Sequence, residues 1–141
     1  MAEFSDGRIR HLAMIQEVIA RMAGESARMK QFALTAIGVL ASTCVATRSA
    51  PLAGVAGVLT VIFWLLDAQY LRQERWFRAL YDQVRLAEGP TDFLMTPNAE
   101  IRRRHTLLDG LFGWSVAPLY GALLTIAVLL ARFVGSAPGT S

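Results

Sequence analysis

The sequence contains a single cysteine, Cys44, and a single lysine, Lys30. One cysteine cannot form an internal disulfide, and Cys44 lies in an apolar stretch where no zinc site can be assembled around it. Charged residues make up only 18% of the chain, against about 25% in a typical soluble domain. Because 54% of the residues are hydrophobic, this shortage of charge indicates a membrane protein.

Motifs for catalysis are also missing. The two histidines, His11 and His105, have no metal-ligand spacing to a cysteine or to an acidic cluster. No glycine-rich phosphate loop follows a strand, because the sequence predicts no strand. We therefore expect no enzymatic activity, no metal site and no cofactor.

Three stretches without charged residues are long enough to cross a membrane. The first two are residues 31–47 and 49–66, which flank Arg48, and the third is residues 110–131. As helices they would be about 26, 27 and 33 Å long, close to the thickness of the hydrocarbon core. The first two stretches are too close in sequence to do anything but turn back, so residues 31–66 predict a transmembrane hairpin.

The fold class expected is all-α: an integral membrane protein with three transmembrane helices and long cytoplasmic helical extensions. Apolar residues recur every three or four positions in residues 1–30, which predicts an amphipathic cytoplasmic helix with Gly24 as a hinge. Residues 67–109 form a second cytoplasmic helical segment. Since the chain has no glycine or proline between Gly57 and Gly89, the second span should continue into water without a break.

The third transmembrane helix is assigned to residues 110–134, with a kink at Pro118, and residues 135–141 to a disordered tail. Small residues recur every four positions in this helix and in the first span, which favours close approach of another helix. Three short helices bury little core, so we expect a homo-oligomeric bundle, with a tetramer as the first choice and packing within one chain as the alternative. The candidate oligomer or pore face comprises Gly113, Ala117, Gly121, Thr125, Gly38 and Ser42.

Arginines gather in the predicted cytoplasmic segments, with aromatic residues among them. Guanidinium groups bind phosphate in a bidentate way, and aromatic rings stack on bases, so this mixture suits a nucleotide or a single-stranded oligonucleotide. The same mixture also suits the membrane interface, so lipid anchoring stays open as the alternative. The candidate phosphate-binding residues are Arg72, Arg75, Arg78, Arg85, Arg102, Arg103 and Arg104.

Two stretches resemble a family of small bacterial inner-membrane proteins found in defence islands beside a nucleotidyltransferase. They are RMAGESARMKQFALT, residues 21–35, and FWLLDAQYLRQERWFRALYDQVR, residues 63–85, and they cover 38 of the 141 residues. The sequence departs from the family pattern at Glu25, Gln31 and Gln69. The positions that match are Arg21, Met22, Ser26, Lys30, Phe63, Trp64, Leu66, Asp67, Tyr70, Leu71, Arg72, Glu74, Arg75, Phe77, Arg78, Leu80, Tyr81, Asp82, Val84 and Arg85.

The resemblance implies an anti-phage effector, similar to the channel of a Hailong-type system, in which a nucleotidyltransferase makes a short DNA oligomer that controls the channel. We therefore expect an ion channel or pore regulated by a nucleotide or oligonucleotide. Its expected partners are other copies of the chain, the lipid bilayer, the signal and the nucleotidyltransferase itself. A scaffold that recruits a cytosolic enzyme without forming a pore is the alternative, and a toxin that needs no ligand is a third possibility.

The distribution of basic residues predicts the topology in a bacterial inner membrane. Residues 1–30 contain five basic residues and residues 67–109 contain seven, whereas the other side has only Arg48 and Arg132. Because basic residues are retained on the cytoplasmic side, the N-terminus should be cytoplasmic and the C-terminus outside. Alkaline phosphatase fused after Ser141 should therefore be active in cells. A silent fusion, with an active cytosolic reporter at the same position, would exclude the three-span topology.

Overall fold

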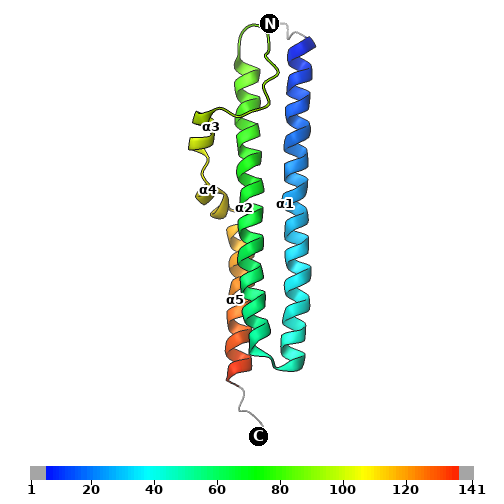
Figure 1. The fold of residues 1–141 in the computed structure, drawn as a ribbon, viewed down its shortest axis with the longest axis vertical. Helices are drawn as coiled ribbons and strands as arrows, with labels where there is room; N and C mark the ends of the chain where they lie inside the picture. The colour runs from blue at the N-terminus through cyan, green and yellow to red at the C-terminus, as the bar shows by residue number, and fades with distance from the viewer. Residues whose placement is uncertain (1–5, 137–141) are drawn as a thin grey trace.

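The computed structural model describes residues 6–136, and these residues form five helices (Figure 1). Helices α1 (Asp6–Thr47), α2 (Ala50–Leu86) and α5 (Ala117–Gly135) are long, whereas α3 (Ala99–Arg104) and α4 (Leu107–Leu111) are short. Helices make up 83% of this part of the chain, and residues 6–136 contain no strand. The prediction of an all-α fold is confirmed. The predicted tail residues 137–141, together with residues 1–5, lie outside the described part.

Helices α1, α2 and α5 are each long and apolar enough to cross a membrane. Helices α1 and α2 form an antiparallel hairpin, and α5 lies beside the half of α2 that is nearest the hairpin turn (Figure 1). At 1.5 Å per residue α1 is about 63 Å long and α2 about 55 Å, so both extend well beyond a bilayer core of about 30 Å. The chain reverses at Arg48, whose φ of 49° is in the left-handed region.

Helix α1 passes residue 30 without interruption. The sequence places a cytoplasmic helix and a first span on either side of this position, but the structure joins them in one rod. Gly24 lies inside α1 with helical residues on both sides, so it does not form the expected hinge. The apolar pattern of residues 1–30 and the apolar run of residues 31–47 therefore belong to a single helix.

Three apolar clusters hold the helices together along the length of the hairpin. The cluster nearest the turn contains Cys44, Ala53 and Val134, and the middle cluster joins α1, α2 and α5 around Ile37 and Tyr120. The third cluster lies in the charged half of the hairpin, which is formed by residues 6–30 of α1 and residues 67–86 of α2. Burial of apolar side chains provides the main stabilisation of the fold there too. Its buried members are Ile15, Leu80 and Ile101, packed against Ile19, Trp76, Phe77, Tyr81 and Val84.

The third long helix starts later than the sequence predicts. Residues 107–111 form α4, the chain then turns, and α5 begins only at Ala117 and ends at Gly135. Pro118 lies in the first turn of α5, where its missing N–H is not needed, so it begins the helix and does not kink it. Gly113 lies in the turn, so it does not continue the helical face of Ala117 and Gly121.

Helix α4 is tied to α2 through its backbone. Trp64 Nε1 donates a hydrogen bond to the Leu111 carbonyl at 3.1 Å, and Arg75 Nη1 donates to the Asp109 carbonyl at 2.9 Å. The Thr106 backbone N–H and hydroxyl donate to the Asp109 carboxylate, which caps the helix. These two hydrogen bonds hold the pKa of Asp109 below its usual range, so the cap stays charged at neutral pH.

A pair of glycine substitutions tests how closely α4 approaches α2. A Cβ atom at Gly110 would lie 2.5 Å from the Ala68 carbonyl oxygen, whereas a Cβ at Gly24 meets nothing within 4 Å. Gly110→Ala should lower the free energy of unfolding by about 1–3 kcal/mol, because backbone has to move. Gly24→Ala should raise it by up to about 1 kcal/mol, because alanine favours the helix. Thermal unfolding of both variants in detergent, followed by circular dichroism, measures the two effects, and equal stability would contradict the close approach.

Candidate functional site

A buried cluster of polar side chains joins α1 and α2 at the end of their apolar runs. The Asp67 carboxylate is completely buried and forms an ion pair with Lys30, with 2.7 Å between Nζ and Oδ2. The Ser26 hydroxyl donates a hydrogen bond to Asp67 Oδ1 and accepts one from Lys30 Nζ at 2.8 Å. The three side chains therefore form a closed triangle across the interface of the two helices.

Helix α5 completes the surroundings of this cluster. The Tyr120 side chain is completely buried, and its hydroxyl lies close enough to Asp67 to interact with its charge. This hydroxyl makes no hydrogen bond of ordinary geometry in the structure. The Tyr120 ring stacks on Trp64, with 6.4 Å between the ring centroids. Tyr120 thus brings α5 next to the buried carboxylate.

The ion pair between Lys30 and Asp67 has a large desolvation penalty. A buried carboxylate loses its hydration, and an ammonium ion at 2.7 Å compensates for this loss only in part. Removing one partner of such a pair costs about 3–5 kcal/mol, whereas replacing both by apolar residues is often neutral. We therefore expect the pair to contribute less to the free energy of folding than to the selection of one arrangement of the helices.

Three residues of this cluster come from the two stretches that carry the family resemblance. Ser26 and Lys30 belong to residues 21–35, and Asp67 belongs to residues 63–85. In the sequence Lys30 and Asp67 are simply the charges that end two apolar runs, and nothing local predicts that they meet. Their similar separation from the turn at Arg48, in opposite directions along the chain, was the available signal.

The candidate phosphate-binding arginines have partners within the chain in most cases. The Arg72 guanidinium lies 4.5 Å from the centre of the Trp76 ring, and Arg75 donates to the Asp109 carbonyl. The others are paired as follows: Arg78 with Glu74 at 2.5 Å, Arg85 with Asp82 at 3.3 Å, and Arg104 with Glu100 at 2.5 Å. Arg102 and Arg103 are exposed and have no acidic partner among residues 6–136.

These arginines do not converge on one pocket. Arg72 and Arg85 are thirteen residues apart on α2, which separates them by about 20 Å along the helix axis. Trp76 Nε1 donates to the His105 carbonyl at 3.2 Å, and this places the end of α3 beside the middle of the charged half of α2. The arrangement offers a basic surface along one end of the molecule.

The candidate oligomer face is largely open in the single chain. Gly121 and Gly38 have nothing within 4 Å of an added Cβ atom, and Ser42 and Thr125 are exposed. Ala117 is partly exposed. Gly113 is different, because it is buried and its Cβ would lie 3.0 Å from the Leu71 side chain. The face on α5 therefore comprises residues 117, 121 and 125, and Gly113 instead helps to attach the preceding turn to α2.

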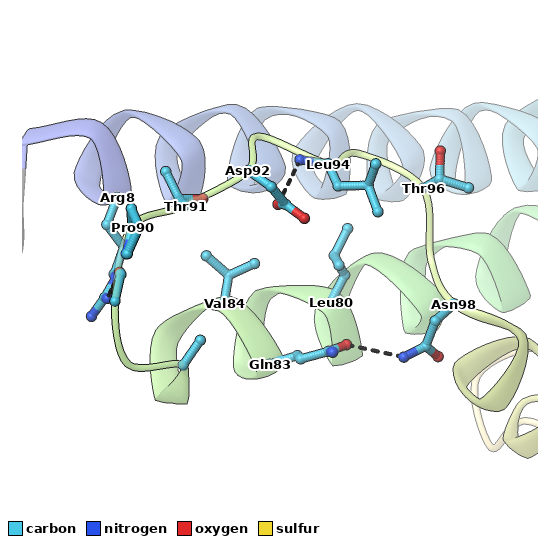
Figure 2. Close-up of a pocket in the computed structure, with 12 residues that line it drawn as sticks. Arg8, Leu80, Gln83, Val84, Pro90, Thr91, Asp92, Leu94, Thr96 and Asn98 are labelled. Carbon is cyan, nitrogen blue, oxygen red and sulfur yellow. Dashed lines mark hydrogen bonds between the residues drawn. The ribbon is translucent and has the colours of Figure 1, made fainter.

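A cavity of about 240 Å³ lies at the open end of the hairpin, between the start of α1, the end of α2 and the segment that leads to α3 (Figure 2). Two pairs of its lining residues are hydrogen-bonded to each other: Gln83 accepts from Asn98 at 3.4 Å, and Asp92 accepts from the Leu94 N–H at 3.0 Å. Nearby, the buried His11 ring contacts the Thr91 hydroxyl at 2.5 Å and the Leu94 carbonyl at 3.2 Å. These contacts attach the connecting segment to α1.

Residues 6–136 contain no group of three histidine, cysteine or acidic side chains suited to a metal ion. Comparisons of the chain with protein-family models, with curated proteins and with solved structures find no match. The fold and the site define an α-helical protein with three helices suited to a membrane and a buried ion pair between the first two.

Variants of the Lys30–Asp67 pair distinguish the effect of removing one charge from the effect of replacing both. Lys30→Met should lower the free energy of unfolding by about 3–5 kcal/mol, because it leaves the Asp67 charge buried without its counterion. The double variant Lys30→Met/Asp67→Leu should recover most of this loss. Arg104→Gln is the matched control, since its ion pair is exposed and is worth about 0–1 kcal/mol. Thermal unfolding in detergent measures all three variants. A double variant that is less stable than Lys30→Met would contradict this account.

Proposed function

We propose that the protein is a homo-oligomeric membrane effector of anti-phage defence that forms an ion-conducting path under the control of a nucleotide or oligonucleotide. The observation that supports this proposal most directly is the buried Lys30–Asp67 pair. It lies where α1 and α2 leave their apolar runs, and Tyr120 brings α5 to the same point. A movement of the charged half of the hairpin must therefore either preserve this cluster and move all three spans, or break it.

Assembly would place the open face of α5 against a neighbouring chain. The small side chains of Ala117 and Gly121 would allow two backbones to approach closely. Charged residues are absent between Lys30 and Arg48 and between Arg48 and Asp67. A path lined by these helices would thus have an apolar constriction in its closed state, where water is expelled and ions cannot pass.

A ligand would act by competing for contacts that now lie within the chain. Arg75 connects α2 to the Asp109 carbonyl of α4, and α4 leads into α5 through the turn at residues 112–116. A phosphate that attracts this guanidinium would release one end of the α4 segment, since a guanidinium binds an anionic phosphate in a bidentate pair that is stronger than its single hydrogen bond to a neutral carbonyl. Ligand binding on the charged half of the hairpin would in this way change the position of α5, the third span.

A membrane scaffold is the second candidate, and one observation favours it. Large apolar side chains are exposed in the charged half of the hairpin: Ile9 is 54% exposed, Met14 49% and Leu86 73%. A cytosolic enzyme that covers these residues would be anchored at the membrane without any pore. Conduction separates the two proposals, because a scaffold carries no current.

Reconstitution of the purified chain in potassium-loaded liposomes tests the proposed function. We expect potassium efflux that changes when short single-stranded DNA oligomers are added. Potassium efflux at the same rate with and without the oligomers would indicate a ligand-independent pore. A lack of efflux in every condition would favour the scaffold. The double variant Lys30→Met/Asp67→Leu should keep its fold but lose the response to the oligomers, because the junction that transmits the movement is gone.

Gly121→Leu tests whether assembly is needed. The single chain has room for this side chain, so the fold should be retained while a close helix contact is blocked. We expect a smaller oligomer by light scattering in detergent and loss of efflux. Ala122→Leu, an exposed neighbour on α5, is the matched control and should change neither. An unchanged oligomer in Gly121→Leu would place this face against lipid.

A further inference from the structure

Three large apolar side chains are exposed just before α5 begins. Leu108 is 63% exposed, Phe112 73% and Trp114 90%. They lie within seven residues of each other, in α4 and in the turn that follows it. An exposed apolar cluster of this kind, beside polar residues, marks a surface that another apolar phase covers.

The segment cannot bury these side chains by turning over. Its inner side is formed by backbone that is packed on α2, with Gly110 against the Ala68 carbonyl. Trp64 and Arg75 hold the carbonyls of Leu111 and Asp109 from the same side. The exposed side chains are therefore presented outward by a backbone that is fixed in place.

The same contacts define the level of the segment along the hairpin. Residues 64–68 of α2 lie at the end of an uncharged run, where Asp67 is the first charged residue. A segment attached to these residues lies at the boundary between the apolar and the charged part of the molecule. Tryptophan prefers this boundary in membranes, because its ring is apolar and its N–H can bind water or headgroups.

Basic side chains lie on the charged side of this level. Arg102 and Arg103 are in the last turn of α3, exposed and without an acidic partner among residues 6–136. The hydrogen bond from Trp76 to His105 places the end of α3 about 14 Å along α2 from Asp67. Extended arginine side chains and a screening length of about 8–10 Å bring these charges within range of phospholipid headgroups.

We infer that residues 102–116 form an interfacial anchor for anionic phospholipid. Leu108, Phe112 and Trp114 enter the boundary of the acyl chains, and Arg102 and Arg103 bind headgroup phosphates. An oligonucleotide would use the arginines but would leave Leu108 and Phe112 in water. A second copy packed symmetrically on this surface would bring further unpaired arginines to it, which like-charge repulsion disfavours. The inference goes beyond the proposed function, since it holds whether or not the protein conducts ions.

Tryptophan fluorescence tests the position of the segment. The full chain is reconstituted in phosphatidylcholine vesicles with or without lipid brominated on its acyl chains. The difference between the wild type and Trp114→Phe isolates Trp114 from the other two tryptophans. We expect brominated lipid to quench this difference signal and aqueous acrylamide to have little effect. Quenching by acrylamide alone would overturn the inference, and so would protection from both agents, which would indicate cover by another copy.

A lipid preference tests the arginines. Vesicles that contain brominated phosphatidylglycerol should quench Trp114 more strongly than vesicles with the same fraction of brominated phosphatidylcholine. Arg102→Gln/Arg103→Gln should reduce this preference by about five-fold for each arginine removed at low salt. Arg10→Gln removes a charge from an exposed position on α1 that lies about 30 Å along the helix from Lys30, and it should leave the preference unchanged.

If Arg102 and Arg103 bind an oligonucleotide and not lipid, the same variants should give a different result. A fluorescent single-stranded DNA oligomer is titrated into the wild type, into Arg102→Gln/Arg103→Gln and into the control Arg10→Gln in phosphatidylcholine vesicles. If Arg102→Gln/Arg103→Gln abolishes DNA binding and keeps the lipid preference, these arginines belong to a nucleic-acid site and the inference is wrong. If it reduces the lipid preference and leaves DNA binding as in the control variant, the lipid anchor is supported.

Discussion

The ion pair between Lys30 and Asp67 is the constraint on which the rest of the architecture depends. A carboxylate with no exposed surface needs a counterion, and in this hairpin only one register brings the ammonium ion to it. Lys30 precedes Arg48 by 18 residues, and Asp67 follows Ser49 by 18 residues, so the tight turn and the ion pair require the same register. An apolar interface between two long helices would tolerate several registers, because small aliphatic side chains pack in many combinations.

The third helix is positioned through the same region of α2. Tyr120 covers Asp67, Trp64 binds the Leu111 carbonyl, and Ala68 leaves room only for a glycine at position 110. These contacts lie within about one turn and a half of α2. One packing arrangement consequently fixes where α5 starts, where α4 lies along α2 and how the polar cluster around Asp67 is covered. The charged half of the hairpin is held separately, by the apolar cluster around Ile15 and Leu80.

Much of the helical framework could be predicted, because it follows from local patterns. The uncharged runs around Arg48 and the absence of glycine and proline between Gly57 and Gly89 correspond to α1 and to an unbroken α2. The prediction for the third helix was less accurate, since residues 110–116 are apolar but form a short helix and a turn. Hydropathy does not distinguish an apolar segment that crosses a membrane from one that lies at its surface.

The candidate site required the tertiary structure. The pattern of arginines suggested a phosphate-binding surface. In the folded chain, however, Arg72 lies on an aromatic ring, Arg75 donates to a backbone carbonyl and Arg78 pairs with a carboxylate. By itself the sequence determined that the chain is helical, that three stretches suit a membrane and that charge is unequally distributed, since each depends on composition and spacing along the chain. Only the tertiary structure decided that Asp67 is buried against Lys30 and Ser26, because burial depends on atoms that distant segments bring together.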